Sequence, residues 1–187
     1  MSIYQLPADL PVPVDDRATD HLVGLEVPRL RLDSSEGVVD LAELGAKLAV
    51  LYVYPATGVP GRPTPDSWDA IPGARGCTPQ SCAFRDHAGE LAGVGARVAG
   101  LSSQPLEAQI EFARREHIPF PLIADPALEL RDALPLPTFV FDGVALYKRV
   151  TLVFESALVA KVFYPLFPPD QNAAEVVAWL TYRRRSE

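Results

Sequence analysis

The sequence LAVLYVY, residues 48–54, is a continuous apolar run that ends at Pro55. Such a run is typical of a strand in the buried centre of a sheet, where both faces are covered. Residues 56–76 follow with four prolines and four glycines, which is too long and too punctuated for an ordinary connection. The stretch CTPQSCAFRD, residues 77–86, then opens a helical spacing of apolar residues. The sequence therefore predicts a central strand, a long loop and a helix that begins near Cys77.

Strand and helix patterns alternate on both sides of this strand. Further strands are expected at residues 29–33, 38–40, 98–101, 120–123, 138–141, 150–154 and 158–163. Helices are expected at residues 41–44, 77–93, 105–117 and 128–134, and from Asp170 or Asn172 toward the C-terminus. Asp40 is expected to cap the first helix, and Ser102 or Ser103 the third. The inner face of the third helix is expected to carry Leu106, Ile110, Ala113 and His117.

This order predicts one α/β domain with a central mixed sheet flanked by helices. Residues 1–22 form a separate N-terminal arm in this interpretation, because Pro7, Pro11 and Pro13 favour extended backbone. The domain proper then covers residues 23–187, with residues 56–76 as an inserted Pro/Gly-rich loop. The Asp142-Gly143 pair predicts a hairpin turn after residues 136–139.

Composition excludes several functions. The 187 residues carry a formal net charge of −7, whereas a nucleic-acid binder needs a basic face. No window approaches 18 uninterrupted apolar residues, so no membrane span is expected, and the N-terminus lacks the pattern of a secretion signal. A cytoplasmic location is expected. The three histidines are scattered and no Gly-rich phosphate loop is found, so neither a metal nor an organic cofactor is expected.

The chain has two cysteines, Cys77 and Cys82, which are too few for a disulfide framework or a four-thiolate zinc site. A redox pair, a catalytic thiol and two buried core residues remain as alternatives. A thiol reacts as its thiolate, and a helix N-terminus favours that anion through its unpaired N–H groups. Cys77 is placed for this effect, because Gly76 precedes it and Pro79 is tolerated in a first helical turn.

Helix geometry limits what the two thiols can do together. Five residues of an intact helix rise ~7.5 Å, so the two Cα atoms would lie roughly 8 to 9 Å apart, beyond the reach of a disulfide. Oxidation of the pair must therefore unwind the first turn of the helix. If Cys77 is first oxidised to a sulfenic acid, Cys82 can condense with it after unwinding. The alternative is that both cysteines are small buried hydrophobic residues.

The stretch CTPQSCAFRD resembles the catalytic segment of the peroxiredoxins, in particular the peroxiredoxin Q, or bacterioferritin-comigratory-protein, subfamily. That subfamily has the pattern Cys-Thr-x-x-(Ala/Ser)-Cys-x-Phe-Arg-Asp. LYVYP at residues 51–55 is similar to the strand and Tyr-Pro that lead into the family's active site. GLS at 100–102, FPLIAD at 120–125 and RVTLV at 149–153 resemble later landmarks, so the resemblance covers about residues 25–182.

The resemblance implies a thioredoxin-like fold and a thiol peroxidase of the atypical two-cysteine type. Cys77 would attack the peroxide, Cys82 would resolve the sulfenic acid as an intramolecular disulfide, and Arg149 would stabilise the thiolate and orient the peroxide. A guanidinium suits that role because it is always charged and donates in a fixed fork. The peroxide site would be lined by Tyr54, Pro55, Ala74 and Gly76. The implied partners are hydrogen peroxide or organic hydroperoxides and a thioredoxin-like or other thiol reductant, with the enzyme a monomer or homodimer.

The sequence departs from the family pattern Pro-x-x-x-Thr-x-x-Cys. Ala74 stands where the threonine is expected, and some 15 extra residues separate Pro55 from the cysteine segment. Thr57 or Ser67 could supply the missing hydroxyl, or backbone N–H groups could suffice. Arg75 adds a cation next to the nucleophile.

The inserted loop carries Trp68 among its prolines, which suggests a lid over the Cys77 pocket; a mobile solvated loop is the alternative. Two other functions also fit paired thiols. One is a peroxide-responsive redox sensor, and the other is a non-enzymatic thioredoxin-fold thiol protein such as a copper-delivery protein. The latter usually has Cys-x-x-x-Cys spacing and a membrane anchor, neither of which is expected here.

Overall fold

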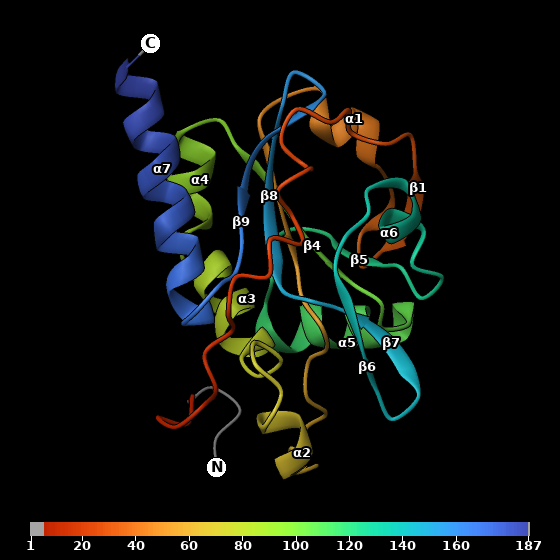
Figure 1. Cartoon of the computed structure of the whole chain (residues 1–187). Coiled ribbons are helices and arrows are strands. Elements are labelled where there is room, and N and C mark those ends of the chain that lie inside the picture. The colour runs from red at the N-terminus through yellow and green to blue at the C-terminus, as the bar shows by residue number, and fades with distance from the viewer. Residues whose placement is uncertain (1–5, 187) are drawn as a thin grey trace.

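In the computed structural model, which describes residues 6–186, seven strands form one mixed sheet in the order β2-β1-β5-β4-β3-β8-β9 (Figure 1). They are β1 (Arg31–Ser34), β2 (Gly37–Asp40), β3 (Ala49–Val53), β4 (Arg97–Ser102), β5 (Leu122–Ala124), β8 (Val150–Glu155) and β9 (Leu158–Phe163). Strands β3, β4 and β5 run parallel, whereas β8 pairs antiparallel with β3. The predicted α/β fold with a central mixed sheet is confirmed.

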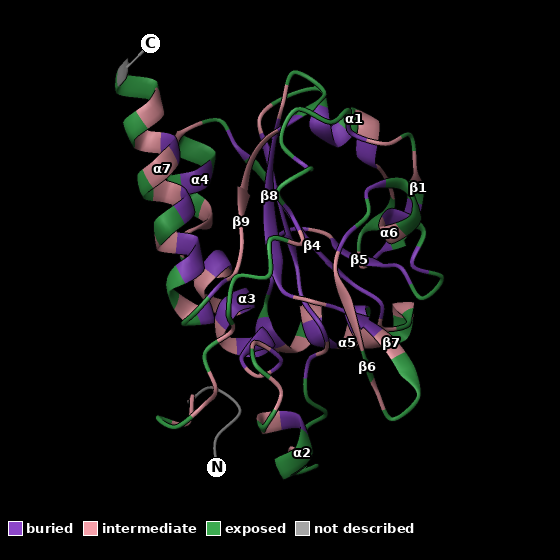
Figure 2. Ribbon diagram, in the orientation of Figure 1, coloured by how far each residue is buried: buried purple, intermediate pink, exposed green. Residues whose placement is uncertain are grey.

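Strand β3 lies inside the sheet, and all of its residues are buried. Its side chains alternate between two apolar layers, because successive residues of a strand point to opposite faces. Leu51 and Val53 belong to the layer covered by α1 and α6, while Val50 and Tyr52 belong to the layer covered by α3, α4, α5 and α7. Figure 2 shows the buried residues concentrated along the central strands. This two-sided burial explains the uninterrupted apolar run at residues 48–54.

The helices are α1 (Leu41–Gly45), α2 (Asp66–Asp69), α3 (Cys77–Asp86), α4 (Ala88–Gly93), α5 (Leu106–Glu116), α6 (Glu129–Ala133) and α7 (Asn172–Ser186), with a 3-10 turn η1 (Pro169–Gln171). Asp40 caps α1 by accepting a hydrogen bond from the Glu43 N–H, as predicted. The helix expected over residues 77–93 is divided at His87 into α3 and α4. Helices α3, α4 and α7 lie on the same side of the sheet (Figure 1).

Two predictions for α5 are wrong. Its N-cap is Pro105, whereas Ser102 donates its hydroxyl to the Pro55 carbonyl and Ser103 makes no cap. Its buried residues are Gln109, Phe112 and Glu116, whereas Ile110 and His117 are exposed. The buried face of α5 differs from the face that the apolar spacing predicts, because Gln109 and Glu116 have polar partners inside the protein. These partners are Tyr54 and Cys82, respectively.

A separate hairpin of β6 (Thr138–Phe141) and β7 (Val144–Tyr147) turns at Asp142 and Gly143, which both have positive φ, as predicted. Trp68, in α2 of the inserted loop, packs against this hairpin and is 8% exposed. Its ring centroid lies 5.9 Å from that of Phe139 and 4.9 Å from that of Phe141. The loop of residues 56–76 is therefore anchored to the hairpin by an aromatic cluster.

Residues 6–22 of the expected arm lie against the domain, and residues 1–5 lie outside the described part of the chain. Leu22 is fully buried in the core layer of α1 and α6. Asp16 binds Lys148 at 2.6 Å and accepts the Tyr164 hydroxyl at 2.8 Å. These two contacts lower the pKa of Asp16 to about 2. The division into an arm of residues 1–22 and a domain of residues 23–187 stays a prediction.

Candidate active site

Cys77 is the first residue of α3, and it is 3% exposed. Gly76 precedes it as the N-cap with a φ of 103°, a left-handed conformation that side chains disfavour. A Cβ at Gly76 would also lie 2.9 Å from Leu6 Cδ2 and would overlap Pro169. This turn therefore requires glycine, and it brings the Cys77 sulfur to the end of a helix whose first N–H groups have no intrahelical partner.

Arg149 reaches Cys77 because of the sheet register. Val53 pairs with Val150, so Arg149 lies beside the end of β3, where the chain leaves the sheet for the cysteine helix. Arg149 is 4% exposed, which excludes a surface arginine at a strand end. Its Nη2 donates to the Cys77 sulfur at 3.3 Å.

The guanidinium of Arg149 is held by neutral groups. It donates to the carbonyl oxygens of Gly73, Ala74 and Arg75 at 3.1 to 3.3 Å, and to the amide oxygen of Gln80. Among these contacts the Cys77 sulfur is the one group able to become an anion. A thiolate at Cys77 would therefore compensate a buried positive charge that, in the described part of the chain, is bonded to no carboxylate.

Gln80 was missed by the sequence analysis. It is fully buried, and its Nε2 donates to Asn172 Oδ1 at 3.0 Å. Asn172 in turn accepts the Thr151 hydroxyl at 2.7 Å, so a chain of side chains runs from Arg149 back into the sheet and α7. Gln80 stands three residues after Cys77, and that spacing places it on the same helix face, a signal that could have found it. Asn172 and Thr151 had no such signal, because the fold alone brings them close.

Neither of the two residues expected to replace the missing threonine, Thr57 and Ser67, supplies its hydroxyl to the site. Ala74 is buried, and its carbonyl accepts hydrogen bonds from Arg149 and from the Cys77 thiol, the latter at 3.6 Å. The Thr57 hydroxyl donates to Gln104 at 3.1 Å, and Ser67 is exposed in α2. The expectation that Thr57 or Ser67 replaces the hydroxyl is therefore wrong.

A cavity of about 30 Å³ lies beside Gly76, large enough for about one water-sized molecule. Its lining residues are Ala56, Gly58, Thr64, Arg75, Gly76, Thr78 and Pro79. Thr64 and Thr78 were not singled out in the sequence, yet they are the hydroxyl residues of this cavity. Arg75 is 10% exposed in its side chain and pairs with Asp69 of α2 at 3.1 Å, so its charge is compensated by the inserted loop.

Tyr54 and Pro55 take positions at the end of β3. The Tyr54 hydroxyl donates to Gln109 of α5 at 2.5 Å, and burial raises its pKa well above the ordinary value. Pro55 is buried, and its carbonyl accepts the Ser102 hydroxyl at 2.8 Å. Neither residue lines the cavity beside Gly76. The structure thus places Gly76, Ala74 and Arg149 around the Cys77 sulfur. Tyr54 and Pro55 lie farther back, at the end of β3.

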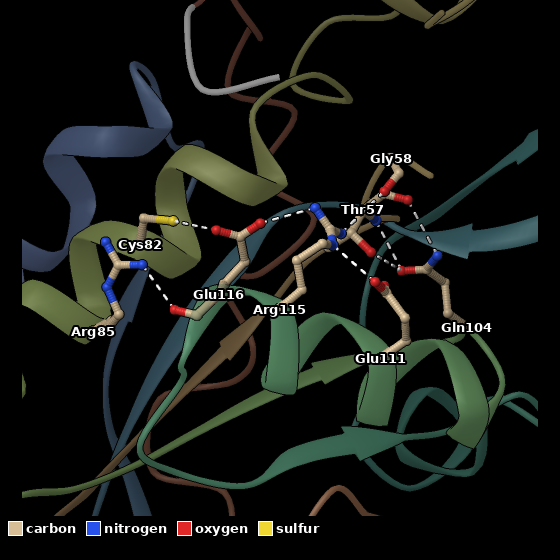
Figure 3. Close-up of polar contacts among 8 residues, drawn as sticks. All are labelled: Thr57, Gly58, Cys82, Arg85, Gln104, Glu111, Arg115 and Glu116. Atoms are coloured by element: carbon tan, nitrogen blue, oxygen red, sulfur yellow. Dashed lines mark hydrogen bonds and ion pairs between the residues drawn. The ribbon is translucent and has the colours of Figure 1, made fainter. Parts of the chain in front are cut away.

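Cys82 lies on the same helix in a different environment. Its thiol donates to Glu116 Oε2 of α5 at 3.7 Å (Figure 3). Burial, followed by the nearby Glu116 carboxylate, raises the pKa of the Cys82 thiol to about 11. Both cysteines are free and α3 is intact between them, which is the arrangement expected for the reduced pair.

Residues 6–186 contain no group of three or more His, Cys, Asp or Glu side chains that could hold a metal ion. Within the same residues, no helix is long and apolar enough to cross a membrane.

Comparison with known proteins agrees with this site. The AhpC/TSA family model matches residues 70–157. A chloroplastic peroxiredoxin Q of Sedum lineare is 28% identical over 158 residues, which are 84% of this chain and 76% of the relative. The chain spans 62% of the corresponding protein of Triticum aestivum. A putative peroxiredoxin bcp of Coxiella burnetii is 27% identical over 84% of this chain and 97% of the relative.

Solved structures of peroxiredoxins are also similar to this chain. Peroxidoxin BcpB of Mycobacterium tuberculosis is 28% identical, with a TM-score of 0.70 over 87% of this chain and 98% of that one. Peroxiredoxin Q of Xanthomonas campestris, at 22% identity and a TM-score of 0.68, shares the fold. The AhpC/TSA match and the peroxiredoxin relatives indicate a thiol-dependent peroxidase, and a thioredoxin-like sheet with two cysteines on the following helix fits that activity. Within that class, the chain is similar to the peroxiredoxin Q, or bacterioferritin-comigratory-protein, enzymes, at 27–28% identity to the relatives named above.

Proposed function

We propose that Cys77 is the peroxidatic cysteine of this peroxidase, that Cys82 resolves it and that Arg149 activates it. Gly76, Ala74, Tyr54 and Pro55 shape the site, the first two next to the sulfur and the last two behind it. The observation that carries the proposal is the contact between the Arg149 guanidinium and the Cys77 sulfur at 3.3 Å, in a buried site where, among residues 6–186, no carboxylate is bonded to the guanidinium.

The proposed reaction begins with the Cys77 thiolate attacking one oxygen of a hydrogen peroxide or organic hydroperoxide. The O–O bond breaks, the sulfur becomes a sulfenic acid, and water or an alcohol leaves with a proton. The Cys82 thiol then attacks the Cys77 sulfur, forming the S–S bond as the S–O bond breaks and water leaves. A thiol reductant returns both cysteines to the reduced state. The first turn of α3 must unwind for the S–S bond to form, because the two cysteines are too far apart in an intact helix.

Peroxide consumption with a thioredoxin system tests these roles. Cys77→Ser is expected to abolish consumption, and Cys82→Ser to react once and then stall at the sulfenic acid. Mass spectrometry of the native chain after one equivalent of peroxide should give a loss of two hydrogens. Undiminished consumption by Cys77→Ser would overturn the proposal. A redox sensor shares this chemistry, and sustained turnover separates the enzyme from it.

The inserted loop of residues 56–76 acts as a lid in this proposal. It contributes Ala56, Gly58 and Thr64 to the cavity beside Gly76, and Trp68 holds it on the hairpin. Trp68→Ala should loosen the loop and raise the rate with a bulky hydroperoxide, such as cumene hydroperoxide, more than the rate with hydrogen peroxide. Trp179→Ala, on α7 against Phe163, is the control. Equal rate ratios in both variants, or unchanged rates after shortening residues 58–70, would contradict the lid.

A thioredoxin-like reductant, a monomeric or homodimeric assembly and a cytoplasmic location complete the proposal. They rest on the sequence pattern and on the family resemblance. Comparing thioredoxin with glutathione as the reductant tests the first, and sedimentation of the reduced protein tests the second.

A further inference from the structure

Glu116 sits between the resolving cysteine and the inserted loop. It is 3% exposed, at the end of α5, and its Oε2 accepts the Cys82 thiol at 3.7 Å. Its Oε1 accepts Arg115 Nη1 at 2.8 Å, and Arg115 also pairs with Glu111 at 2.9 Å (Figure 3). Arg115 Nη2 further donates to the Gly58 carbonyl of the inserted loop at 3.5 Å. The buried carboxylate thus accepts a hydrogen bond from the Cys82 thiol on one side and from the Arg115 guanidinium on the other.

The same end of α5 also binds a second side chain of the cysteine helix. Arg85, one turn beyond Cys82, donates from Nη1 to the Glu116 carbonyl at 2.8 Å. Helix α3 is therefore tied to α5 through both the side chain and the carbonyl of Glu116. Because a disulfide between Cys77 and Cys82 requires α3 to unwind, these ties must be released before the two sulfurs can meet.

We propose that Glu116 is a positioning residue that latches the resolving cysteine: it keeps the Cys82 thiol protonated and α3 folded, and its release limits disulfide formation. The proposal rests on the proposed resolving role of Cys82. A thiolate beside a buried carboxylate is repelled, and a carboxylate is a strong acceptor for a thiol, so both effects favour the protonated thiol. In the step itself the Cys82 proton leaves with the Cys77 hydroxyl as water.

The sign of the pH dependence follows from the groups around Cys82. In the described residues, the titratable and charged groups that face the sulfur are Glu116 from α5, Arg85 and Asp86 from α3, and Tyr52 from β3. Burial and Glu116 outweigh Arg85 and raise the Cys82 pKa from about 9 to about 11. A raised thiol pKa means that the folded latch is fully formed below pH 9 and is lost as the pH rises toward 11.

The first test uses the Cys77→Ser background, so that Cys82 is the single thiol. The rate of alkylation by iodoacetamide is measured against pH. Cys82 should react with a midpoint near pH 11, and Glu116→Gln should lower that midpoint by part of the shift, because burial, the largest cause of the raised pKa, remains. Glu111→Gln is the matched control, because it removes a carboxylate from the same Arg115 without touching Cys82. Equal midpoints in Glu116→Gln and Glu111→Gln would overturn the latch.

The second test follows disulfide formation in single turnover, after one equivalent of hydrogen peroxide and an acid quench. Glu116→Gln should accelerate this step by about three- to tenfold at pH 7, the range for one hydrogen bond. Glu111→Gln should match the native rate. Slower disulfide formation in Glu116→Gln would mean that Glu116 acts as a base for Cys82 and would overturn the latch.

The native protein supplies a test that requires no substitution at Glu116. Its disulfide-forming rate should keep rising with pH up to about 11, because the protonated, folded thiol is the dominant form below that pH. A rate that levels off near pH 9 would contradict the latch. If the native chain forms no disulfide between Cys77 and Cys82, the proposed resolving role fails instead, and the alkylation profile of Cys82 still reports on Glu116.

Discussion

The two cysteines of α3 share one helix of ten residues and meet opposite charges. Cys77, at its beginning, lies 3.3 Å from the guanidinium of Arg149, whereas Cys82, in its second half, lies 3.7 Å from the carboxylate of Glu116. A cation favours the thiolate and a carboxylate favours the thiol. The difference teaches that residues outside the helix give the two thiols different environments, which is the basis for the proposed order of reaction, first Cys77 and then Cys82.

The largest expected effect is at the Cys77 end. Arg149→Met should lower the second-order rate of peroxide reduction by about 10²- to 10³-fold, the range for removing one charge-stabilising donor from an active site. Lys148→Met is the control, since Lys148 is the neighbouring cation but points to Asp16. The rate is measured by competition with a peroxide-consuming enzyme. A similar rate in Arg149→Met and Lys148→Met would show that Arg149 has no role in peroxide reduction.

Gln80 is expected to have a smaller effect, because it acts through Arg149. Gln80→Leu removes an acceptor from a buried guanidinium and should slow peroxide reduction by about tenfold. Gln171→Leu, the same change at an exposed position of η1, should leave the rate as in the native protein. Stopped-flow reduction of peroxide gives both values. No difference between the two variants would show that Gln80 does not position Arg149.

Gly76 tests the turn that delivers Cys77 to the helix. Gly76→Ala imposes a positive φ on alanine and drives its Cβ into Pro169 and Leu6. Gly37→Ala has a nearly equal φ of 100° with open space around the Cβ. Gly76→Ala should therefore be more destabilising than Gly37→Ala by about 1–3 kcal/mol, the cost of overpacking. Urea unfolding measures both, and equal losses would mean that the arm and η1 do not close on Gly76.

The smallest effect concerns the arm, whose Leu6 lies next to Gly76 at the Cys77 end of α3. The lowered pKa of Asp16, about 2, means that its contribution to stability is present above pH 4 and is lost as the pH falls toward 2. Because Asp16 is exposed, Asp16→Asn should cost at most about 1 kcal/mol at pH 7, and this cost should shrink as the pH falls from 4 through about 2. Asp20→Asn, exposed in the same arm, is the control. A cost that stays the same between pH 7 and pH 2 would contradict the assignment to charge.

Much of the fold follows from the sequence, because the apolar runs are long and their breaks are strong. The buried β3, the Asp142-Gly143 hairpin and the Asp40 cap could all be predicted from local residues. The inner face of α5 could not, since Gln109 and Glu116 are buried with partners from the residue after β3 and from α3. The spacing of apolar residues does not identify the buried face of a helix when buried polar side chains have hydrogen-bond partners in other elements.

The residues of the site also divide into those that could be predicted from the sequence and those that could not. Cys77, Cys82 and Arg149 stand in a recognisable pattern, and Gln80 could have been found from its helical spacing. Glu116 and Asn172 could not, because each is separated from its cysteine-helix partner by many residues. The missing threonine shows a further limit: the sequence pointed to Thr57 and Ser67, whereas the hydroxyls beside Gly76 belong to Thr64 and Thr78.

The contrast between the two thiols is tested most directly by mapping where peroxide first oxidises the reduced protein. Cys82→Ser and Cys77→Ser are each treated with one equivalent of hydrogen peroxide at pH 7 in the presence of dimedone, and the labelled peptide is found by mass spectrometry. The charge environments predict a stoichiometric adduct on Cys77 in Cys82→Ser and almost none on Cys82 in Cys77→Ser. A comparable adduct on Cys82, or none on Cys77, would contradict the assignment of attack to Cys77 and resolution to Cys82.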